Sequence, residues 1–223
     1  MSTPTVAPPP ADLAAGESRI LIHRLNWKGY LRLLKFFGDD GPRLSYLNGM
    51  VELMSPVPHH EQNSQVLDRM ASDLIVGLDI HAKGQGATMY KRRHLKRGFG
   101  ADQCYYLTSL DLNRGKDLAR LKPLPVPDLG IEVEFTSSLL DKLAIYAGMG
   151  VPGIWRQDRD GLTVLILGAD GKYGAAERSR AFPFLPMDGF RRQFAAYDPD
   201  ADTAFFRSYR TWVREVVAPL HQA

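Results

Sequence analysis

The sequence predicts an α/β protein in which helices pack against a mixed β-sheet. Three observations lead to this expectation: a hairpin pattern at residues 43–54, a strand with two-residue alternation at 128–135, and several segments with apolar residues at helical spacing. The chain has 223 residues, of which 44% are hydrophobic and 24% are charged. This is the composition of an ordinary globular protein, and it excludes collagen-like, coiled-coil and wholly disordered chains.

The N-terminal residues 1–18 predict a disordered leader, because they contain three consecutive prolines and few large apolar side chains. One domain is expected over residues 19–223. Within it, residues 25–37 carry five large apolar side chains at helical spacing and are followed by Gly38. This segment predicts a short amphipathic helix.

The clearest local signal is a β-hairpin. Two strand-like runs, 43–47 and 50–54, are joined by Asn48-Gly49, a dipeptide that favours a type I′ turn. A helix is expected next, over residues 59–78, and two further strands over residues 87–93 and 102–107.

The strand at residues 128–135 alternates without interruption. Its odd positions are apolar, and its even positions are Asp128, Gly130, Glu132 and Glu134. Ser137 or Ser138 can then cap a helix. A β-meander is expected from residue 154 through strands at 154–156 and 162–167 to a second turn at Asp170-Gly171. A last helix with an aromatic face is expected over residues 202–217, which suggests a homodimer.

The cysteine count and the hydropathy pattern bear on the cellular compartment. Cys104 is the one cysteine and cannot close an intramolecular disulfide, which favours a reducing compartment. The N-terminus has no apolar core of signal-peptide length, and no run of about 18 apolar residues occurs. We therefore expect a cytoplasmic protein without a transmembrane helix.

The positive charge is concentrated in one stretch. The formal net charge is +3, but a segment without acids carries Lys83, Lys91, Arg92, Arg93, Lys96 and Arg97. A concentrated basic stretch on a slightly acidic body is typical of a surface that faces phosphates. The alternative is an ordinary solvated strand or loop.

The three carboxylates of the alternating strand are the first candidates for chemistry. Glu132 and Glu134 would be about 6.6 Å apart along the strand, so a positive group should lie near them. A magnesium ion is one solution, and Lys142 on the following helix is another. The alternative is a solvent-facing strand with surface acids.

Two further acids and a histidine pair are notable. Asp102 can bind the same metal ion as Glu132 if the strands that carry these two residues pair. Glu52 lies on an apolar strand face, where an unpaired charge is uncommon, although an edge-strand acid would explain it too. His59 and His60 are adjacent and cannot form a zinc pair on one helix face. No common zinc, P-loop, dinucleotide or serine-hydrolase motif is present.

Several motifs follow one another along the chain. In order, they are Leu44-Ser45-Tyr46-Leu47-Asn48-Gly49-Met50-Val51-Glu52-Leu53-Met54-Ser55-Pro56, a histidine, Asp102, Pro127-Asp128-Leu129-Gly130-Ile131-Glu132-Val133, Lys142, Tyr146 and Gly150-Val151-Pro152 before Trp155. This order resembles the Uma-type endonuclease family over about residues 25–200. That family is similar in fold to the restriction-endonuclease-like, or PD-(D/E)XK, nucleases.

The resemblance implies a mixed-sheet core flanked by helices and metal-dependent hydrolysis of phosphodiester bonds. By position, Asp102 and Glu132 resemble the pair that holds Mg²⁺ or Mn²⁺. Glu52 resembles the upstream acid that completes the site, and His60 resembles the histidine after the Ser-Pro pair. Lys142 would orient or activate the attacking water.

This sequence departs from the superfamily pattern. Glu134 occupies the position of the superfamily lysine, so Lys142 would have to reach back from the next helix. Ala101 stands where the motif has proline. The literal Pro127-Asp128 pair is an alternative, but Asp128 and Glu132 would lie about 13 Å apart on one strand, too far to share one ion. Asp102 is therefore preferred, and His60, Glu134 and Asp128 are accessory candidates.

The leading hypothesis is an endonuclease that acts on nucleic acid, with DNA favoured. One alternative is a catalytically inactive module of the same fold that binds nucleic acid or forms a homodimer. Another is a metal-dependent hydrolase of small phosphate esters. The presence of Glu52, Asp102, Glu132 and Lys142 together favours activity, and the basic stretch favours a polymeric substrate.

Overall fold

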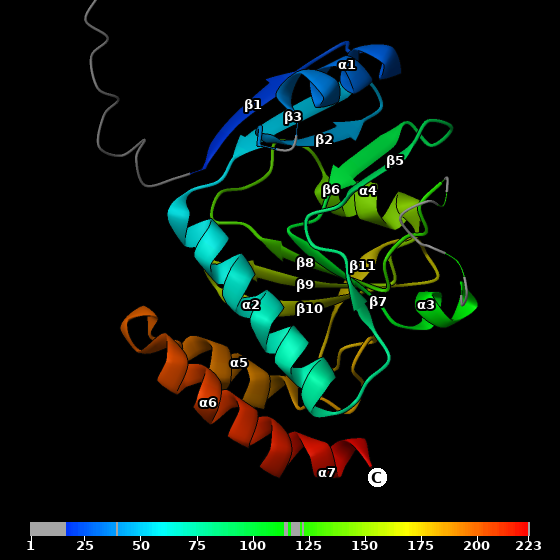
Figure 1. Ribbon diagram of the computed structural model, residues 1–223. Coiled ribbons are helices and arrows are strands. Elements are labelled where there is room, and N and C mark those ends of the chain that lie inside the picture. Colours follow the sequence, from blue (N-terminus) through cyan, green and yellow to red (C-terminus); the bar gives the residue numbers. More distant parts are fainter. Residues whose placement is uncertain (1–16, 39, 114–115, 117–120, 122, 223) are drawn as a thin grey trace, which may run out of the picture.

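The computed structural model describes residues 17–38, 40–113, 116, 121 and 123–222, and the strands in these residues form two sheets (Figure 1). The first sheet has the order β1 (Ser18–Ile22), β3 (Met50–Ser55), β2 (Arg43–Leu47), β6 (Arg97–Gly100) and β5 (Met89–Arg92). The second has the order β11 (Tyr173–Ala176), β10 (Gly161–Leu167), β9 (Gly153–Asp158), β8 (Leu129–Val133), β7 (Gln103–Tyr106) and β4 (Lys83–Gly84). Neighbouring strands are antiparallel except β8 and β9, which are parallel. The predicted α/β fold with a mixed sheet is confirmed.

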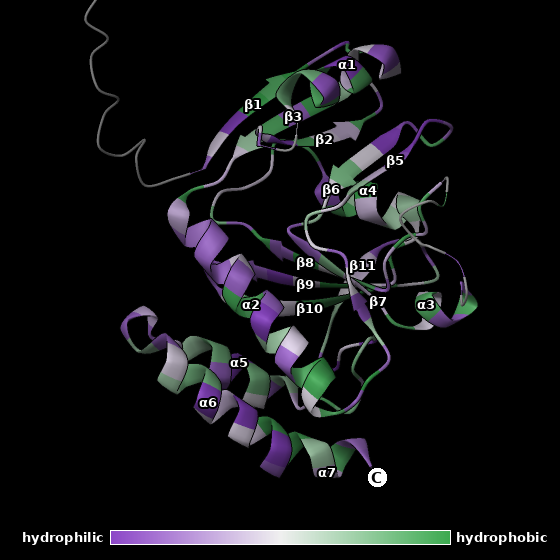
Figure 2. Ribbon diagram, viewed as in Figure 1, coloured by the Kyte–Doolittle hydropathy of each residue, from purple (hydrophilic) through white to green (hydrophobic). Residues whose placement is uncertain are grey.

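The helices flank these sheets. They are α1 (Trp27–Phe37), α2 (Pro58–Gly77), α3 (Thr108–Leu112), α4 (Lys142–Met149), α5 (Met187–Ala195), α6 (Asp202–Trp212) and α7 (Ala218–His221), with a 3-10 turn at Pro199–Ala201 and a π-helical turn at Val213–Val217. In Figure 1, α1 lies beside the first sheet, while α2, α5 and α6 lie on the side of the second sheet. The N-terminal half of α2 is hydrophilic (Figure 2), and it leads from the end of β3 to the second sheet.

The predicted hairpin is confirmed as β2 and β3. Its turn residues Asn48 and Gly49 have φ angles of 49° and 94°, both positive, as a type I′ turn requires. Glycine adopts such angles without strain, and asparagine tolerates them better than most residues. The turn therefore sets the register that brings Ser45 opposite Glu52.

The predicted boundary of the N-terminal leader is wrong by two residues. Glu17 is buried, and Ser18 begins β1, which pairs with β3 along its whole length. Because the partner strand lies far along the chain, no local pattern indicates this pairing. The rest of the predicted leader, residues 1–16, lies outside the described residues.

Some elements have no clear sequence signal. In β6, Gly98 and Gly100 weaken the strand pattern, yet Gly98 is needed because a Cβ there would collide with the Tyr30 side chain. In α5, Gly189 lies against the Trp212 ring. In both segments the tertiary contact, rather than the local propensity, explains the glycine.

Both faces of β8 are buried. Leu129, Ile131 and Val133 belong to the core that also contains buried residues of α2 and α6. On the other face, Gly130 and Glu132 lie toward α4, and Glu132 is 3% exposed. The expected alternation is present, but the alternative of a solvent-facing acidic strand is wrong for Glu132.

Helix α4 begins later than expected. Its N-cap is Asp141, whose Oδ1 accepts a hydrogen bond of 2.8 Å from the backbone N–H of Ala144. Ser138, one of the two predicted caps, instead donates from Oγ to Glu52 Oε2 at 2.6 Å. The helix therefore starts at Lys142, which places this lysine in its first turn.

The aromatic face of the last long helix is used inside the chain. Phe205, Phe206 and Tyr209 are buried in the same core as α2, and the Tyr209 hydroxyl donates to the carbonyl of Met70 at 3.0 Å. The aromatic face is therefore covered within the chain and gives no support to the expected homodimer. None of the helices in the described residues combines the length and apolar character needed to cross a membrane.

Candidate active site

Asp102 and Glu132 lie side by side where the two sheets meet. Asp102 stands between β6 and β7, and β7 pairs with β8 so that Gln103 is opposite Ile131. Continuing this antiparallel register by one residue sets Asp102 opposite Glu132, on the same face of the sheet. The backbone N–H of Val133 donates to Asp102 Oδ2 at 2.7 Å and holds the aspartate in place.

Helix α4 supplies two donors to Glu132. Lys142 Nζ lies 2.9 Å from Glu132 Oε2, and the Tyr146 hydroxyl donates to Oε1. Lys142 and Tyr146 are four residues apart on the helix and therefore share a face. Burial alone would lower the pKa of Lys142, but the charges of Glu132 and Glu134 outweigh it and raise this pKa, so the lysine is cationic.

Glu134 lies at the edge of this group. Its Oε1 is 3.6 Å from Lys142 Nζ, and among the described residues no donor forms a hydrogen bond with that oxygen. Burial raises the pKa of Glu134, the Lys142 charge partly offsets this, and the Glu132 charge adds to it. Glu134 therefore lies next to the Glu132–Lys142 pair, and its Oε1 can still accept a hydrogen bond.

Asp102 also contacts an arginine and a histidine. Arg43 of β2 places Nη1 on Asp102 Oδ1 and donates from Nη2 to Glu61 Oε1 at 2.7 Å. His60, in the first turn of α2, has Nε2 2.6 Å from Arg43 Nη1 and 3.1 Å from Asp102 Oδ2. The aspartate is thus held by a cation from the first sheet.

His60 is held in turn by Glu17. The imidazole Nδ1 lies 2.6 Å from Glu17 Oε1, so the tautomer that donates from Nδ1 and accepts from Arg43 at Nε2 satisfies both contacts. Glu17 Oε2 also accepts from Arg19 at 2.6 Å and from the Thr136 hydroxyl at 2.7 Å. Burial alone would raise the pKa of Glu17, but these hydrogen bonds outweigh it and hold the pKa well below its usual range.

Glu52 does not join the Asp102–Glu132 pair. Its Oε1 accepts from Arg19, and its Oε2 accepts from the Ser138 hydroxyl at 2.6 Å and from the backbone N–H of Leu140 at 2.8 Å. Because both oxygens are occupied by protein donors, the expected role of Glu52 as a metal ligand is not supported by its contacts. The residue instead anchors the loop that leads to Lys142.

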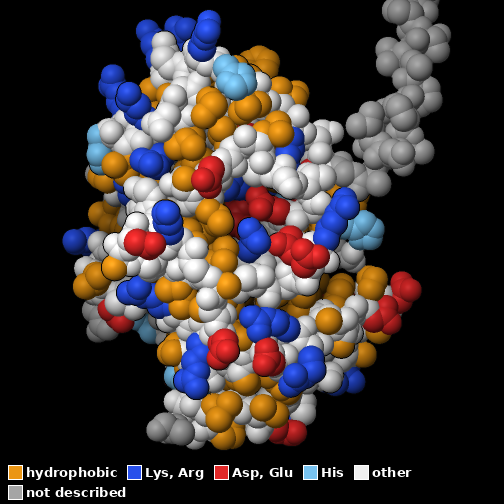
Figure 3. All heavy atoms as spheres, turned by 180° about the vertical axis from the view of Figure 1, so that it is seen from behind, with side chains coloured by type: hydrophobic (Ala, Val, Ile, Leu, Met, Phe, Trp, Pro, Cys, Tyr) orange, Lys and Arg blue, Asp and Glu red, His pale blue; other side chains and the backbone are white. Residues whose placement is uncertain are grey.

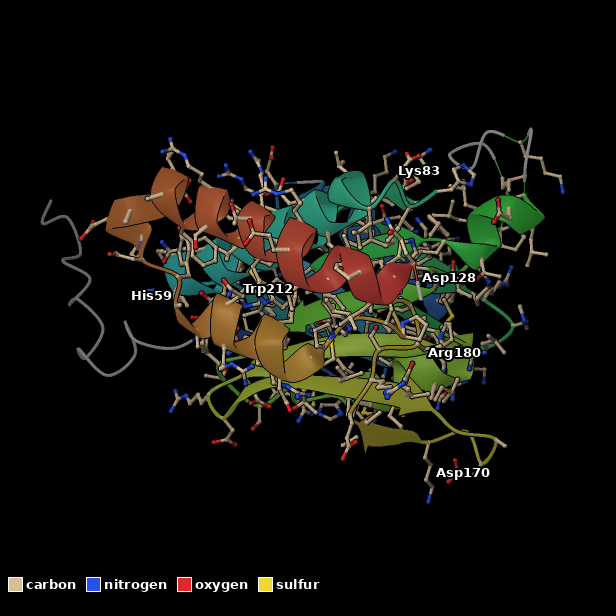
Figure 4. All side chains as sticks on the ribbon, turned by 90° about the horizontal axis from the view of Figure 1, so that it is seen from below. His59, Lys83, Asp128, Asp170, Arg180 and Trp212 are labelled. Carbon is tan, nitrogen blue, oxygen red and sulfur yellow. The ribbon has the colours of Figure 1, made fainter. Side chains whose placement is uncertain are left out.

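Asp128 lies away from this group. Its Oδ2 accepts from the backbone N–H groups of Leu107 and Ser109 at 2.7 and 2.9 Å, so it caps the start of α3. Figure 4 shows Asp128 on the opposite side of the molecule from His59, the neighbour of His60. These contacts give no support to the accessory role considered for Asp128 and assign its carboxylate a structural role as a cap.

The basic stretch divides into two parts. Lys91, Arg93 and Lys96 are exposed on the β5–β6 hairpin, whereas Arg92 donates to the carbonyl of Leu124 and Arg97 donates to that of Leu95. Lys83, in the short strand β4, lies on the Asp128 side of the molecule, away from His59 (Figure 4). The hairpin is thus the part that offers free cations next to the strand leading into Asp102.

A comparison with protein families identifies the chain. The sequence profile of Uma2, described as "Putative restriction endonuclease", matches residues 27–196. The chain belongs to the Uma2 family. The expected resemblance is confirmed, and the match includes Asp102, Glu132 and Lys142.

The chain also has a distant structural neighbour. A solved structure described as "a putative nuclease belonging to DUF820 from Anabaena variabilis" has 14% sequence identity and a TM-score of 0.45, and the alignment covers 77% of the Uma2 chain and 92% of that structure. No curated protein matches the sequence.

The charge balance of the Uma2 site leaves an excess of carboxylates. Its acids are Glu17, Glu52, Asp102, Glu132 and Glu134, and its permanent cations are Arg19, Arg43 and Lys142. Arg156, opposite Glu132 on β9, pairs with Asp158 at 3.1 Å and adds no net charge. Figure 3 shows acidic side chains gathered at mid-height of the molecule, with Lys and Arg beside them. Buried excess negative charge favours an additional cation.

The donor set fits a hard divalent cation. Within the described residues, no three His, Cys, Asp or Glu side chains are arranged to hold a metal ion. Mg²⁺ does not require such a cluster, because it is usually bound by one or two carboxylates together with water and substrate phosphate. Asp102 and Glu132 provide these two carboxylates.

The sequence predicted no role in the site for Glu17, Arg19, Arg43 or Tyr146, although Tyr146 belongs to the motifs that resemble the family. Glu17 and Arg19 lie at the end of a Pro-rich segment and carry no motif. Arg43 is one of many surface-type arginines in the sequence. Tyr146 had a signal, because it follows Lys142 by one helical turn and is part of the motif order typical of the family.

Proposed function

We propose that this Uma2 protein is a Mg²⁺-dependent endonuclease that hydrolyses phosphodiester bonds in DNA. The observation that carries this proposal is the pair of buried carboxylates, Asp102 and Glu132, set opposite each other with the Lys142 ammonium 2.9 Å from Glu132. Two carboxylates and a lysine are the groups that phosphoryl hydrolysis with a hard cation needs. The family description, restriction endonuclease, favours DNA over RNA.

Each residue has a role in this proposal. Asp102 and Glu132 would hold Mg²⁺, and Val133 and Tyr146 orient these carboxylates through hydrogen bonds. Mg²⁺, when bound, stabilises the charge that builds on the phosphate oxygens. Lys142, whose Nζ lies 2.9 Å from Glu132, would orient or activate the attacking water.

A binding module without catalysis is the second candidate. It is favoured by one observation: Arg43 and Lys142 already place positive charge on Asp102 and Glu132, so a protein cation occupies each carboxylate. In this case the fold and the basic hairpin would still bind nucleic acid, but no bond would be broken.

Plasmid nicking separates the two candidates. Supercoiled plasmid is incubated at low salt with Mg²⁺ or Mn²⁺ and with the wild type, Glu132→Gln, Asp102→Asn or Asp128→Asn. We expect nicking by the wild type and by Asp128→Asn, because Asp128 caps α3 outside the site. The other two variants should be slower by at least about 100-fold, as when an electrostatic catalytic group is removed.

The Asp128→Asn variant tests which aspartate is functional, Asp102 or Asp128. Loss of nicking in a folded Asp128→Asn variant, with nicking retained in Asp102→Asn, would mean that Asp128, rather than Asp102, is the functional aspartate. If folded wild type bound DNA but nicked nothing with either metal, the binding module would replace the nuclease as the proposed function.

A further inference from the structure

A hollow of about 660 Å³ lies beside the first sheet, next to Arg43, which contacts Asp102. It lies among α1, the start of β2, β5 and the end of β6, and its wall includes Leu34, Lys35, Pro42, Arg43, Met89 and Lys91. The volume lies within the range of small-molecule sites, roughly 300–1,000 Å³. Ala101, which directly precedes Asp102, also lines it, so the hollow leads to the candidate active site.

Arg43 separates the hollow from Asp102. Its guanidinium contacts Asp102 Oδ1, His60 Nε2 and Glu61 Oε1, and its side chain is 20% exposed. Glu61 also lines the hollow, and its side chain is 43% exposed. The arginine can therefore be reached from the hollow while it is bound to a buried carboxylate.

This arrangement opposes metal binding. A divalent cation on Asp102 would meet the Arg43 guanidinium already bound to that carboxylate, and like charges at such distances repel strongly in a poorly solvated site. Arg43 would have to bind another anion before Asp102 could bind the metal ion. A phosphate fits, since the planar guanidinium binds phosphate through two parallel hydrogen bonds.

On the basis of the proposed function, we propose that the hollow binds one phosphodiester group of the nucleic-acid strand and that Arg43 transfers from Asp102 to this phosphate. Substrate binding thereby releases Asp102 for the metal. With Arg43, the wall carries the cations Lys35 and Lys91 against the acids Asp40 and Glu61, a net positive charge. Leu34, Pro42 and Met89 offer an apolar surface to the sugar or base.

The proposal predicts coupling between metal and nucleic acid. Because the coupling free energy between two ligands is reciprocal, a bound phosphodiester must tighten metal binding by the same factor as the metal tightens nucleic-acid binding. Mn²⁺ affinity is measured by calorimetry with and without a short duplex whose linkages are phosphorothioates, which resist hydrolysis. Duplex affinity is measured by fluorescence anisotropy in EDTA.

For the wild type, we expect Mn²⁺ to bind at least about fivefold more tightly when the duplex is present. For Arg43→Ala, Mn²⁺ should bind more tightly than to the wild type without duplex, the duplex should add no further gain, and duplex affinity should fall severalfold. Lys91→Ala should weaken duplex binding and leave Mn²⁺ binding without duplex unchanged. Arg191→Ala, a partly exposed arginine paired with Asp188, is the matched control and should behave as the wild type.

A second variant covers the case in which Arg43→Ala does not fold. Arg43→Lys keeps a cation beside Asp102 and loses the planar fork, so it should bind duplex more weakly and bind Mn²⁺ alone no more tightly than the wild type. Wild-type affinities and coupling in Arg43→Ala, or wild-type duplex affinity in Arg43→Lys, would overturn the proposal. A wild type that nicks plasmid without coupling overturns this inference alone. A wild type that neither nicks nor binds duplex overturns the proposed function as well.

Discussion

The buried carboxylates of the site differ in how their neighbours hold them. Glu17 and Glu52 accept hydrogen bonds from several protein donors, including the shared Arg19, and have a structural role. Asp102 and Glu132 are also paired with cations, Arg43 and Lys142, but these two carboxylates lie opposite each other on neighbouring strands. Two carboxylates set side by side are what a hard divalent cation would require, whereas Glu17 and Glu52 are each held by a separate set of protein donors.

Glu17 should make the stability depend on pH. Its pKa is lower in the folded protein than the value of about 4.3 for an unfolded glutamate, so its contribution is present above that pH and is lost as the pH falls below it. Glu17→Gln should lower the free energy of unfolding at pH 7 by about 3 kcal/mol and flatten its decline in acid. Urea unfolding from pH 7 to pH 3 measures this.

Glu215→Gln is the control, because this exposed glutamate pairs with the exposed Arg214. Equal acid sensitivity in Glu17→Gln and the wild type would contradict the assigned role of Glu17.

At the scale of elements, the site depends on how the loop between β8 and α4 is held. Glu52 of β3 bonds the Ser138 hydroxyl and the Leu140 backbone N–H, and Asp141 then caps α4. These contacts set the start of the helix at Lys142, which reaches back to Glu132. A carboxylate of the first sheet thus positions a lysine that acts on the second.

Weakening the hold of Glu52 on this loop should reduce the proposed nuclease activity without changing the contacts of Asp102 and Glu132. In Glu52→Gln, we expect faster hydrogen exchange at the Leu140 amide, a free energy of unfolding lower by about 2 kcal/mol, and reduced nicking with Mn²⁺ affinity unchanged. Ser138→Ala removes one donor and should lower the free energy of unfolding by about 1 kcal/mol. Hydrogen-exchange mass spectrometry measures the exchange rate at the Leu140 amide. Unchanged protection of Leu140 in Glu52→Gln would show that the loop is held by other contacts.

At the scale of the whole molecule, the candidate active site lies where two sheets meet, and the basic hairpin β5–β6 leads into it. The strand β6 ends at Gly100, two residues before Asp102. The exposed cations of this hairpin therefore lie close along the chain to Asp102. A nucleic-acid backbone that contacts the hairpin would be guided toward Asp102.

The hairpin should contribute to the salt dependence of DNA binding. Replacing Arg93 and Lys96 by alanine removes two exposed cations, so the slope of log affinity against log salt should become shallower by about 0.9 for each phosphate that is no longer neutralised. Anisotropy titrations at several salt concentrations measure the slope. Lys172→Ala combined with Arg178→Ala removes the same charge from another exposed region and should leave the slope unchanged. An identical change in both double variants would mean that only net charge matters.

Local sequence determined the hairpin, the alternating strand β8 (Leu129–Val133), although the predicted bounds of 128–135 were too wide, and the family, because turn dipeptides, periodicity and motif order depend on neighbouring residues. It also indicated Asp102, Glu132 and Lys142 as candidates. Tertiary structure alone decided that Glu52 anchors a loop, that Asp128 caps α3, and that Glu17 and Arg43 join the site. These roles depend on contacts between residues distant in sequence, and such contacts follow from the packing of whole elements, which residue spacing does not encode.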